Sequence, residues 1–194
     1  PVPLALCSPM NESTPPRWLP LLDKLTANIP DFPWGTEQYP VVFTSSNFGV
    51  DNLLAYRRSQ NANCLQWGIT HANVERLCEH YDWGSNFTII SHACVSAQLG
   101  LITAANQLHS GFADKVLLFS YDFLSPFVCG GFNALKILNG YMPAPYCDRE
   151  VGSVALGDGA AYCLVSCENS EFSIEHQSTA NEMFHFTAND PSGD

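Results

Sequence analysis

The segment FTIISHACVSAQLGLITAANQLHSG (87–111) contains the signals of a strand, a tight turn and a helix in direct succession. Residues 87–91 are mostly β-branched or aromatic, as strands prefer. From Val95 to Ser110 the apolar residues recur at helical spacing, and Gly111 is a typical residue just beyond a helix. A strand that passes directly into a helix indicates an α/β fold, in which the turn between them lies at the carboxyl edge of the sheet.

Strands and helices alternate on both sides of this segment. Strand-like runs are predicted at 41–44, 115–121, 151–156 and 160–167, with a further one at 171–177, and helical patterns at 17–28, 70–81 and 132–138. The sequence GDG (157–159) is expected to form a tight turn between two of the strands. Residues 1–16 and 29–40 lack a regular pattern. The alternation predicts a mostly parallel, mixed sheet packed by helices, preceded by a lead-in (1–40) that has one short helix.

Length and composition limit the classes of function. The chain of 194 residues is long enough for one domain or for half of a larger one. Nineteen acidic residues against eight basic ones argue against a nucleic-acid partner, because phosphate binding needs clustered Lys and Arg. No apolar run approaches the about 20 residues that span a bilayer. Neither nucleic acid nor a membrane is therefore expected as a partner.

Cysteine usage predicts the compartment. Eight cysteines are present, but no CxxC pair occurs, so the paired ligand spacing of a zinc site is missing. The first residues, PVPLALCSPM, have no basic region and do not form an intact signal peptide. We predict a cytoplasmic protein with reduced thiols and with no metal or other cofactor.

Cys94 stands apart from the other cysteines because it falls in the turn between the strand and the long helix. The free N–H groups and the positive dipole end of a helix favour a thiolate, and the backbone N–H of Cys94 is a candidate oxyanion donor. The spacing allows two interpretations, a nucleophile or one more buried cysteine. His92 lies two residues earlier and either supports the thiolate as a cation or is a histidine hydrogen-bonded in the core.

The sequence SHACVS (91–96) is similar to the active-site segment of β-ketoacyl-acyl carrier protein synthases, the condensing enzymes of the thiolase superfamily. Further motifs of that family are resembled in the same order along residues 41–193. They are SGFAD (110–114), SYD (120–122), SPF (125–127), GFNAL (131–135), Asp148 with GDGAA (157–161), and HFT (185–187) with DPSG (190–193).

This resemblance implies a thiolase-like fold in which residues 41–194 are the N-terminal half-domain. It implies acyl transfer from an acyl carrier protein or a pantetheine thioester to Cys94, followed by decarboxylative condensation in fatty acid or polyketide synthesis. His92, Phe132 and His185 would then contact the substrate. The family forms homodimers, or heterodimers of a ketosynthase with a partner subunit. Its two catalytic histidines belong to the other half, so the isolated chain is expected to be weak or inactive.

The departures from the family pattern keep other functions open. His92 stands where a small hydroxyl residue is common, and Val151 and Ser153 stand where the family has Arg and Gly. One alternative is a non-catalytic partner that resembles a chain-length factor, and another is a thiolase-like domain with an unrelated binding role. The aromatic and aliphatic residues Phe123, Phe127, Phe132 and Leu135 either line an acyl channel or belong to the core.

Overall fold

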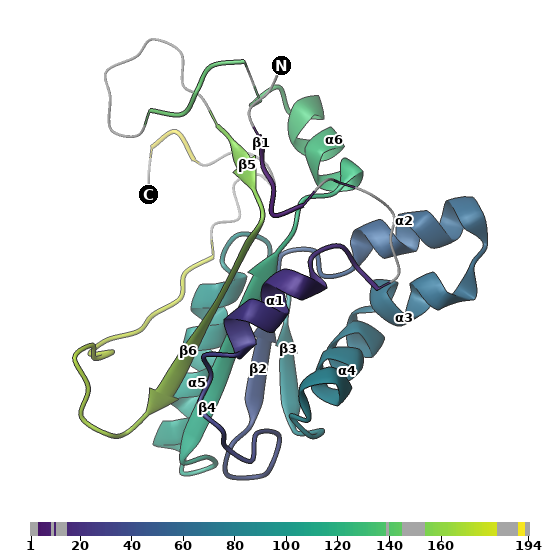
Figure 1. Ribbon diagram of the computed structural model, residues 1–194. Helices are drawn as coiled ribbons and strands as arrows, with labels where there is room; N and C mark the ends of the chain where they lie inside the picture. The colour runs from purple at the N-terminus through teal and green to yellow at the C-terminus, as the bar shows by residue number, and fades with distance from the viewer. Residues whose placement is uncertain are drawn as a thin grey trace.

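The computed structural model describes residues 4–8, 10, 15–138, 140–144, 154–181 and 190–192. Helices and strands alternate along most of the chain (Figure 1). The elements, in chain order, are β1 (Leu4–Ala5), α1 (Leu19–Thr26), β2 (Val41–Thr44), α2 (Val50–Ser59), the 3-10 helix η1 (Ala62–Cys64), α3 (Leu65–Gly68), α4 (Thr70–Tyr81), β3 (Phe87–Ile90), α5 (Ser96–His109), β4 (Lys115–Asp122), α6 (Pro126–Ala134), β5 (Leu156–Gly157) and β6 (Gly159–Ser166).

The main sheet has the strand order β3-β2-β4-β6. β2 pairs in parallel with both β3 and β4, whereas β6 runs antiparallel to β4. A second, two-stranded parallel sheet joins β1 to β5. The mixed, mostly parallel sheet predicted from the sequence is therefore confirmed.

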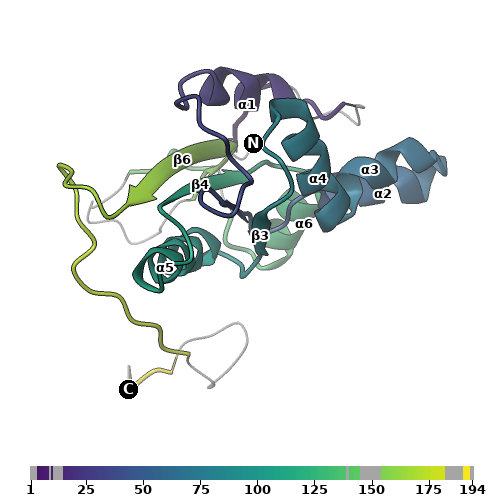
Figure 2. The ribbon, with the colours of Figure 1, turned by 90° about the horizontal axis from the view of Figure 1, so that it is seen from below.

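Helices cover both faces of the main sheet (Figure 2). Along β2, Val41 and Phe43 pack with α1 and α4 in one buried cluster, while Val42 packs with α5 in the other. This alternation follows from the period of two along a strand, and it explains why β2 is apolar throughout. Trp18, Leu22 and Trp34, from the predicted lead-in, belong to the first cluster.

Gly100 allows α5 to lie close to the sheet. A Cβ atom on Gly100 would lie 2.4 Å from Cγ2 of Thr44 and 2.7 Å from Cδ1 of Leu118. Both distances are shorter than van der Waals contact, so any larger residue would push the helix away from β2 and β4. Gly100 thus sets the distance between α5 and the sheet, and with it the position of the turn that precedes the helix.

Most predicted elements lie within two residues of the observed ones, and four expectations were wrong. Residues 157–159 do not form a hairpin turn, because β5 pairs with β1 and β6 pairs with β4 rather than with each other. The helix predicted at 132–138 begins earlier, at Pro126, because the side chain of Ser125 caps its start, and it ends at Ala134. The irregular start contains β1, and the segment 171–177 is not a strand.

The helices α2 and α3 and the 3-10 helix between them were not anticipated, since few of their residues are buried and the apolar period is weak. Of the strand predicted at 151–156, residues 151–153 lie outside the described part of the chain, residues 154–155 are not strand, and Leu156 begins β5. Within the described residues, none of the helices has both the length and the apolar character needed to cross a membrane.

Candidate functional site

Cys94 occupies the predicted place, in the turn between the end of β3 at Ile90 and the start of α5 at Ser96. Its side chain is exposed, whereas Cys64 and Cys78 are buried. The interpretation of Cys94 as one more buried cysteine is therefore wrong. The residue before it, Ala93, has a φ of +46°, in the left-handed region that residues with a Cβ atom rarely adopt.

The Cys94 turn, residues 91–95, is held by backbone and side-chain hydrogen bonds. The backbone N–H of Val95 donates to the carbonyl oxygen of His92 over 3.2 Å. The hydroxyl of Ser96 accepts from the N–H of His92 at 2.7 Å, and it lies 2.8 Å from the carbonyl oxygen of Ala93. The same hydroxyl lies 3.3 Å from the carbonyl oxygen of Ser45, the residue that follows β2.

Asp122, at the end of β4, binds the loop that follows β2. Its Oδ1 accepts hydrogen bonds from the hydroxyl of Ser45 at 2.9 Å, from the N–H and hydroxyl of Ser46 at 2.9 and 2.8 Å, and from the amide of Asn47 at 3.2 Å. The carboxyl ends of β2, β3 and β4 are thus joined into one polar network beside Cys94. The sequence analysis missed this network, although the polar run SSN (45–47) directly after a buried strand is a readable signal.

His92 does not follow the geometry assumed for it. β3 ends at Ile90, so the strand alternation that would align His92 with Cys94 stops before either residue. His92 is exposed, which contradicts the expectation of a histidine hydrogen-bonded in the core. Its backbone N–H, rather than its ring, takes part in the turn. His185, the other predicted substrate-contacting histidine, lies outside the described residues.

The apolar residues around α6 divide into two groups. Phe123 is buried in the core and stacks on Trp18 with ring centroids 5.0 Å apart. Phe127 and Leu135 are 55% and 59% exposed, and Phe132 is half-buried. No residue of α6 is buried. The core interpretation therefore holds for Phe123 alone, and α6 presents an uncovered apolar surface in the described part of the chain.

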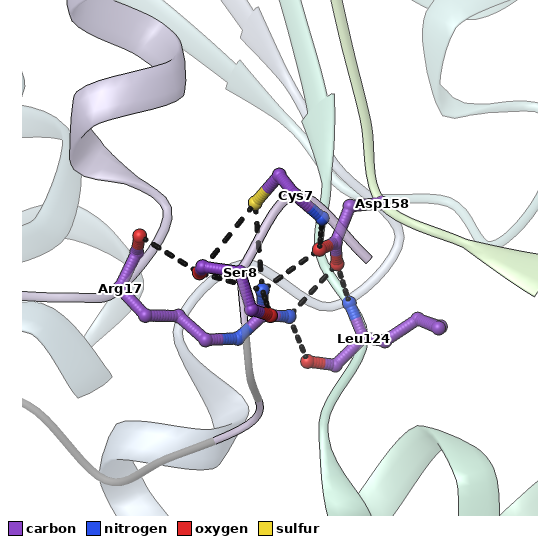
Figure 3. A network of polar contacts seen from close by, with 5 residues as sticks. All are labelled: Cys7, Ser8, Arg17, Leu124 and Asp158. Carbon is purple, nitrogen blue, oxygen red and sulfur yellow. Dashed lines mark hydrogen bonds and ion pairs between the residues drawn. The ribbon is translucent and has the colours of Figure 1, made fainter. Parts of the chain in front are cut away.

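A second polar cluster, shown in Figure 3, lies at the junction of β5 and β6. The guanidinium of Arg17 makes a two-pronged ion pair with Asp158, with N–O distances of 2.7 and 2.8 Å. Asp158 also accepts from the N–H groups of Leu124 and Cys7, and Arg17 donates to the carbonyl oxygen of Leu124. The side chains of Arg17 and Asp158 are only 4% and 1% exposed.

The ionisation of Asp158 follows from these contacts. Burial by itself raises the pKa of a carboxyl group, but the hydrogen bonds from Arg17, Leu124 and Cys7 outweigh it and lower the pKa of Asp158 to about 2. The ion pair joins the N-terminal segment, the loop before α6 and the β5–β6 junction. At this junction the chain passes from β5, which pairs with β1, into β6, which pairs with β4.

Groups of three or more His, Cys, Asp or Glu side chains placed to hold a metal ion are absent from the part of the chain that the structure describes. At the carboxyl edge of the sheet, the structure places the exposed Cys94 thiol in a turn that the Ser96 hydroxyl holds through hydrogen bonds.

Comparisons with known proteins show the fold. No protein-family model matches the sequence, and no curated protein matches it either. Among solved structures, a β-ketoacyl synthase from Burkholderia phymatum STM815 is similar with a TM-score of 0.58 and 18% identity, over 83% of this chain and 47% of that one.

Two complexes show the same likeness. The ketosynthase ApeO with its chain length factor ApeC, from Xenorhabdus doucetiae, gives a TM-score of 0.55 and 21% identity over 79% of this chain and 39% of that one. The type II polyketide synthase complex AntDE:AntF contains an acyl-carrier protein with its ketosynthase. It gives a TM-score of 0.60 and 16% identity, over 73% of this chain and 40% of that one. The chain thus has the thiolase-like fold of part of a ketosynthase, and it spans less than half the length of each of these proteins.

Proposed function

We propose that this chain is the N-terminal half of a ketosynthase-like condensing protein in which Cys94 accepts an acyl group. The observation that carries the proposal is the exposed Cys94 thiol, in a turn at the carboxyl edge of the sheet, directly before the long helix α5. Open α/β sheets bind ligands at that edge, and the start of a helix favours an anionic sulfur.

The proposed chemistry has two steps. The Cys94 thiolate attacks the carbonyl carbon of an acyl thioester, the bond from that carbon to the carrier sulfur breaks, and the released carrier thiolate takes up a proton. A malonyl thioester then loses carbon dioxide, and the resulting carbanion attacks the acyl carbon and displaces the Cys94 thiolate. The backbone N–H of Cys94 is proposed to stabilise the oxyanion. Phe132 is proposed to border the acyl chain, and His92 and His185 to contact the substrate.

The rest of the site is proposed to come from a second half of the protein or from a partner subunit. Condensation needs groups that handle protons near the thiolate, and the uncovered apolar surface of α6 needs a partner to bury it. The related ketosynthases have more than half of their length beyond the region that this chain matches. We propose a homodimer or a ketosynthase heterodimer, with an acyl carrier protein or a pantetheine thioester as the acyl donor.

A reducing, cytoplasmic compartment is also proposed. All seven cysteines in the described part of the chain are free thiols, as is usual where disulfides do not persist.

The test is to incubate the complete gene product with an acyl-pantetheine thioester and to measure the masses of its cysteine-containing peptides. We expect the acyl mass on the peptide that carries Cys94, and no acylation there in Cys94→Ala. Cys167→Ala is the matched control, because Cys167 is also exposed but lies outside the turn, and it should leave the labelling unchanged. An unmodified Cys94 peptide would end the proposal.

A non-catalytic partner of a ketosynthase, similar to a chain-length factor, is the second candidate. The net charge of −11 favours it, because like charges would oppose the docking of an acidic carrier protein. The discriminating experiment combines the chain with an active ketosynthase that copurifies with it. If Cys94→Ala leaves the rate of condensation unchanged, the partner function is favoured, and if the rate is abolished, the partner function fails.

A further inference from the structure

We infer that Ser96 is a positioning residue that closes the Cys94 turn and fixes the thiol relative to the sheet and to α5. The inference rests on the proposed function only in assigning a reactive role to Cys94. The contacts of Ser96 are independent of that role.

The burial of Ser96 distinguishes it from its surroundings. Residues 91–95 and Ala97 are all exposed, whereas Ser96 is only 3% exposed. A hydroxyl group buried without a hydrogen-bond partner is unfavourable, so its place is explained by the bonds that it makes. The bonds cross the Cys94 turn. They join the N–H of His92 and the carbonyl of Ala93, which precede Cys94, to the hydroxyl of Ser96, which follows it.

The conformation of the Cys94 turn depends on hydrogen bonds of this kind. Ala93 is in the left-handed region, which residues with a Cβ atom occupy only where the surrounding structure holds them. The Ser96 hydroxyl holds the peptide group before His92 and the peptide group after Ala93, since it accepts from the N–H of His92 and binds the carbonyl oxygen of Ala93. Replacing the hydroxyl by hydrogen would leave the N–H of His92 without this acceptor and let the turn relax.

Ser96 also links the Cys94 turn to the main sheet. The Ser96 hydroxyl lies 3.3 Å from the carbonyl of Ser45, and the Ser45 hydroxyl in turn donates to Asp122 and accepts from the N–H of Phe48 at 2.8 Å. Asp122, at the end of β4, therefore holds the loop after β2, and Ser96 holds the Cys94 turn against that loop. Ser96 thereby holds Cys94 two residues before the first residue of α5, at the end of a helix that in general favours anionic groups.

The experiment measures alkylation by iodoacetamide, resolved by peptide mass, in the complete protein. The readout is the rate at Cys94 divided by the rate at Cys167 in the same molecules, since both thiols are exposed. Iodoacetamide does not require acyl-transfer activity, so the result is independent of whether Cys94 accepts an acyl group.

Ser96→Ala should lower this ratio by about two- to fivefold, the rate equivalent of losing a helix-terminus interaction at a surface site. Ser96→Thr keeps the hydroxyl and should restore the ratio. Thr103→Val, on the same helix, removes a hydroxyl that bonds only the helix's own Leu99 carbonyl, and it should leave the ratio unchanged. An unchanged ratio in Ser96→Ala would overturn the inference.

Hydrogen exchange of the His92 amide gives a second measurement that does not depend on folding of the Thr variant. Because the Ser96 hydroxyl accepts this N–H at 2.7 Å, exchange at His92 should accelerate in Ser96→Ala and remain slow in Thr103→Val. Equal exchange rates in the two variants would also contradict the positioning role.

Discussion

Replacing Asp158 by asparagine should destabilise the chain far more than the loss of an ordinary surface charge. The Asp158 carboxylate and the Arg17 guanidinium are almost completely buried and bind each other through two N–O contacts. The substitution leaves the Arg17 charge buried opposite a neutral amide. Removing one partner of a buried ion pair costs about 3–5 kcal/mol. For a chain of this length, that loss corresponds to a fall in the melting temperature of roughly 6–20 °C.

The assay is urea unfolding of the wild type, Asp158→Asn, Arg17→Gln and the double variant. Because the double variant contains no unpaired buried charge, it should be less destabilised than the sum of the two single variants, with a coupling free energy of about 2–3 kcal/mol. Glu168→Gln is the matched control: Glu168 pairs with Lys115 at 3.1 Å, but its side chain is 70% exposed, so the cost should stay below about 1 kcal/mol. Strict additivity in the double variant would refute the reasoning.

The same ion pair predicts that the folded chain loses stability in acid. The pKa of Asp158 is lowered from the ordinary 3.8 to about 2 in the folded state, so folding favours its ionised form. The resulting stabilisation, roughly 2 kcal/mol, is complete above about pH 4 and is lost as the pH falls toward 2. Asp158→Asn should remove this part of the pH dependence. An identical slope between pH 4 and 2 in wild type and variant would show that Asp158 titrates normally.

Four further substitutions, one of them a control, test the packing of α5, the cap of α6 and the buried hydrogen bonds of Asn73. In thermal melts, Gly100→Ala should destabilise the fold by about 1–3 kcal/mol, because the new Cβ overpacks against β2 and β4. Gly130→Ala is the control. It lies in α6 with no atom within 4 Å of the new Cβ, and it should be neutral or stabilising by up to about 1 kcal/mol. Ser125→Ala removes the 3.2 Å cap of α6 and should cost about 1 kcal/mol in urea unfolding; no loss would contradict the cap. Asn73→Leu breaks buried bonds to Tyr121 and to the Trp67 carbonyl, both 2.7 Å, and should lower stability by about 2–3 kcal/mol, measured the same way; an unchanged midpoint would show that these bonds contribute little.

The sequence predicted the central elements well because their apolar patterns are strong. β2 and β4 are almost wholly buried, and α5 has apolar residues at helical spacing with a glycine just beyond its end. The weakly patterned α2 was missed, since only Asn52 and Ala55 of its ten residues are buried. The start of α6 was readable from Ser125 and Pro126, a capping residue followed by proline, but the apolar period pointed to a later start.

Long-range polar contacts could not be predicted from local pattern. Arg17 and Asp158 are 141 positions apart, and nothing near either residue indicates the other. GDG (157–159) was interpreted as a turn because glycine and aspartate favour turns. In the fold, the carboxylate of Asp158 is instead bound by Arg17 and by two backbone N–H groups, and the chain continues from β5 into β6.

The geometry around Cys94 follows from the register of the core strands. Thr44 is aligned with Ile90 on one side and with Ser120 on the other, so Ser45 comes level with the beginning of the Cys94 turn, and Asp122 lies two residues beyond Ser120. A slip of one residue in β2 would move Val42 into the cluster of Val41 and Phe43 and reverse every side chain of the strand. Both faces of β2 are buried and apolar, so the fit of Val41 and Phe43 in one cluster and of Val42 in the other opposes that slip. The packing of both faces, rather than an apolar–polar alternation in the sequence, supports this register, and the register brings together the polar groups that no local motif connects.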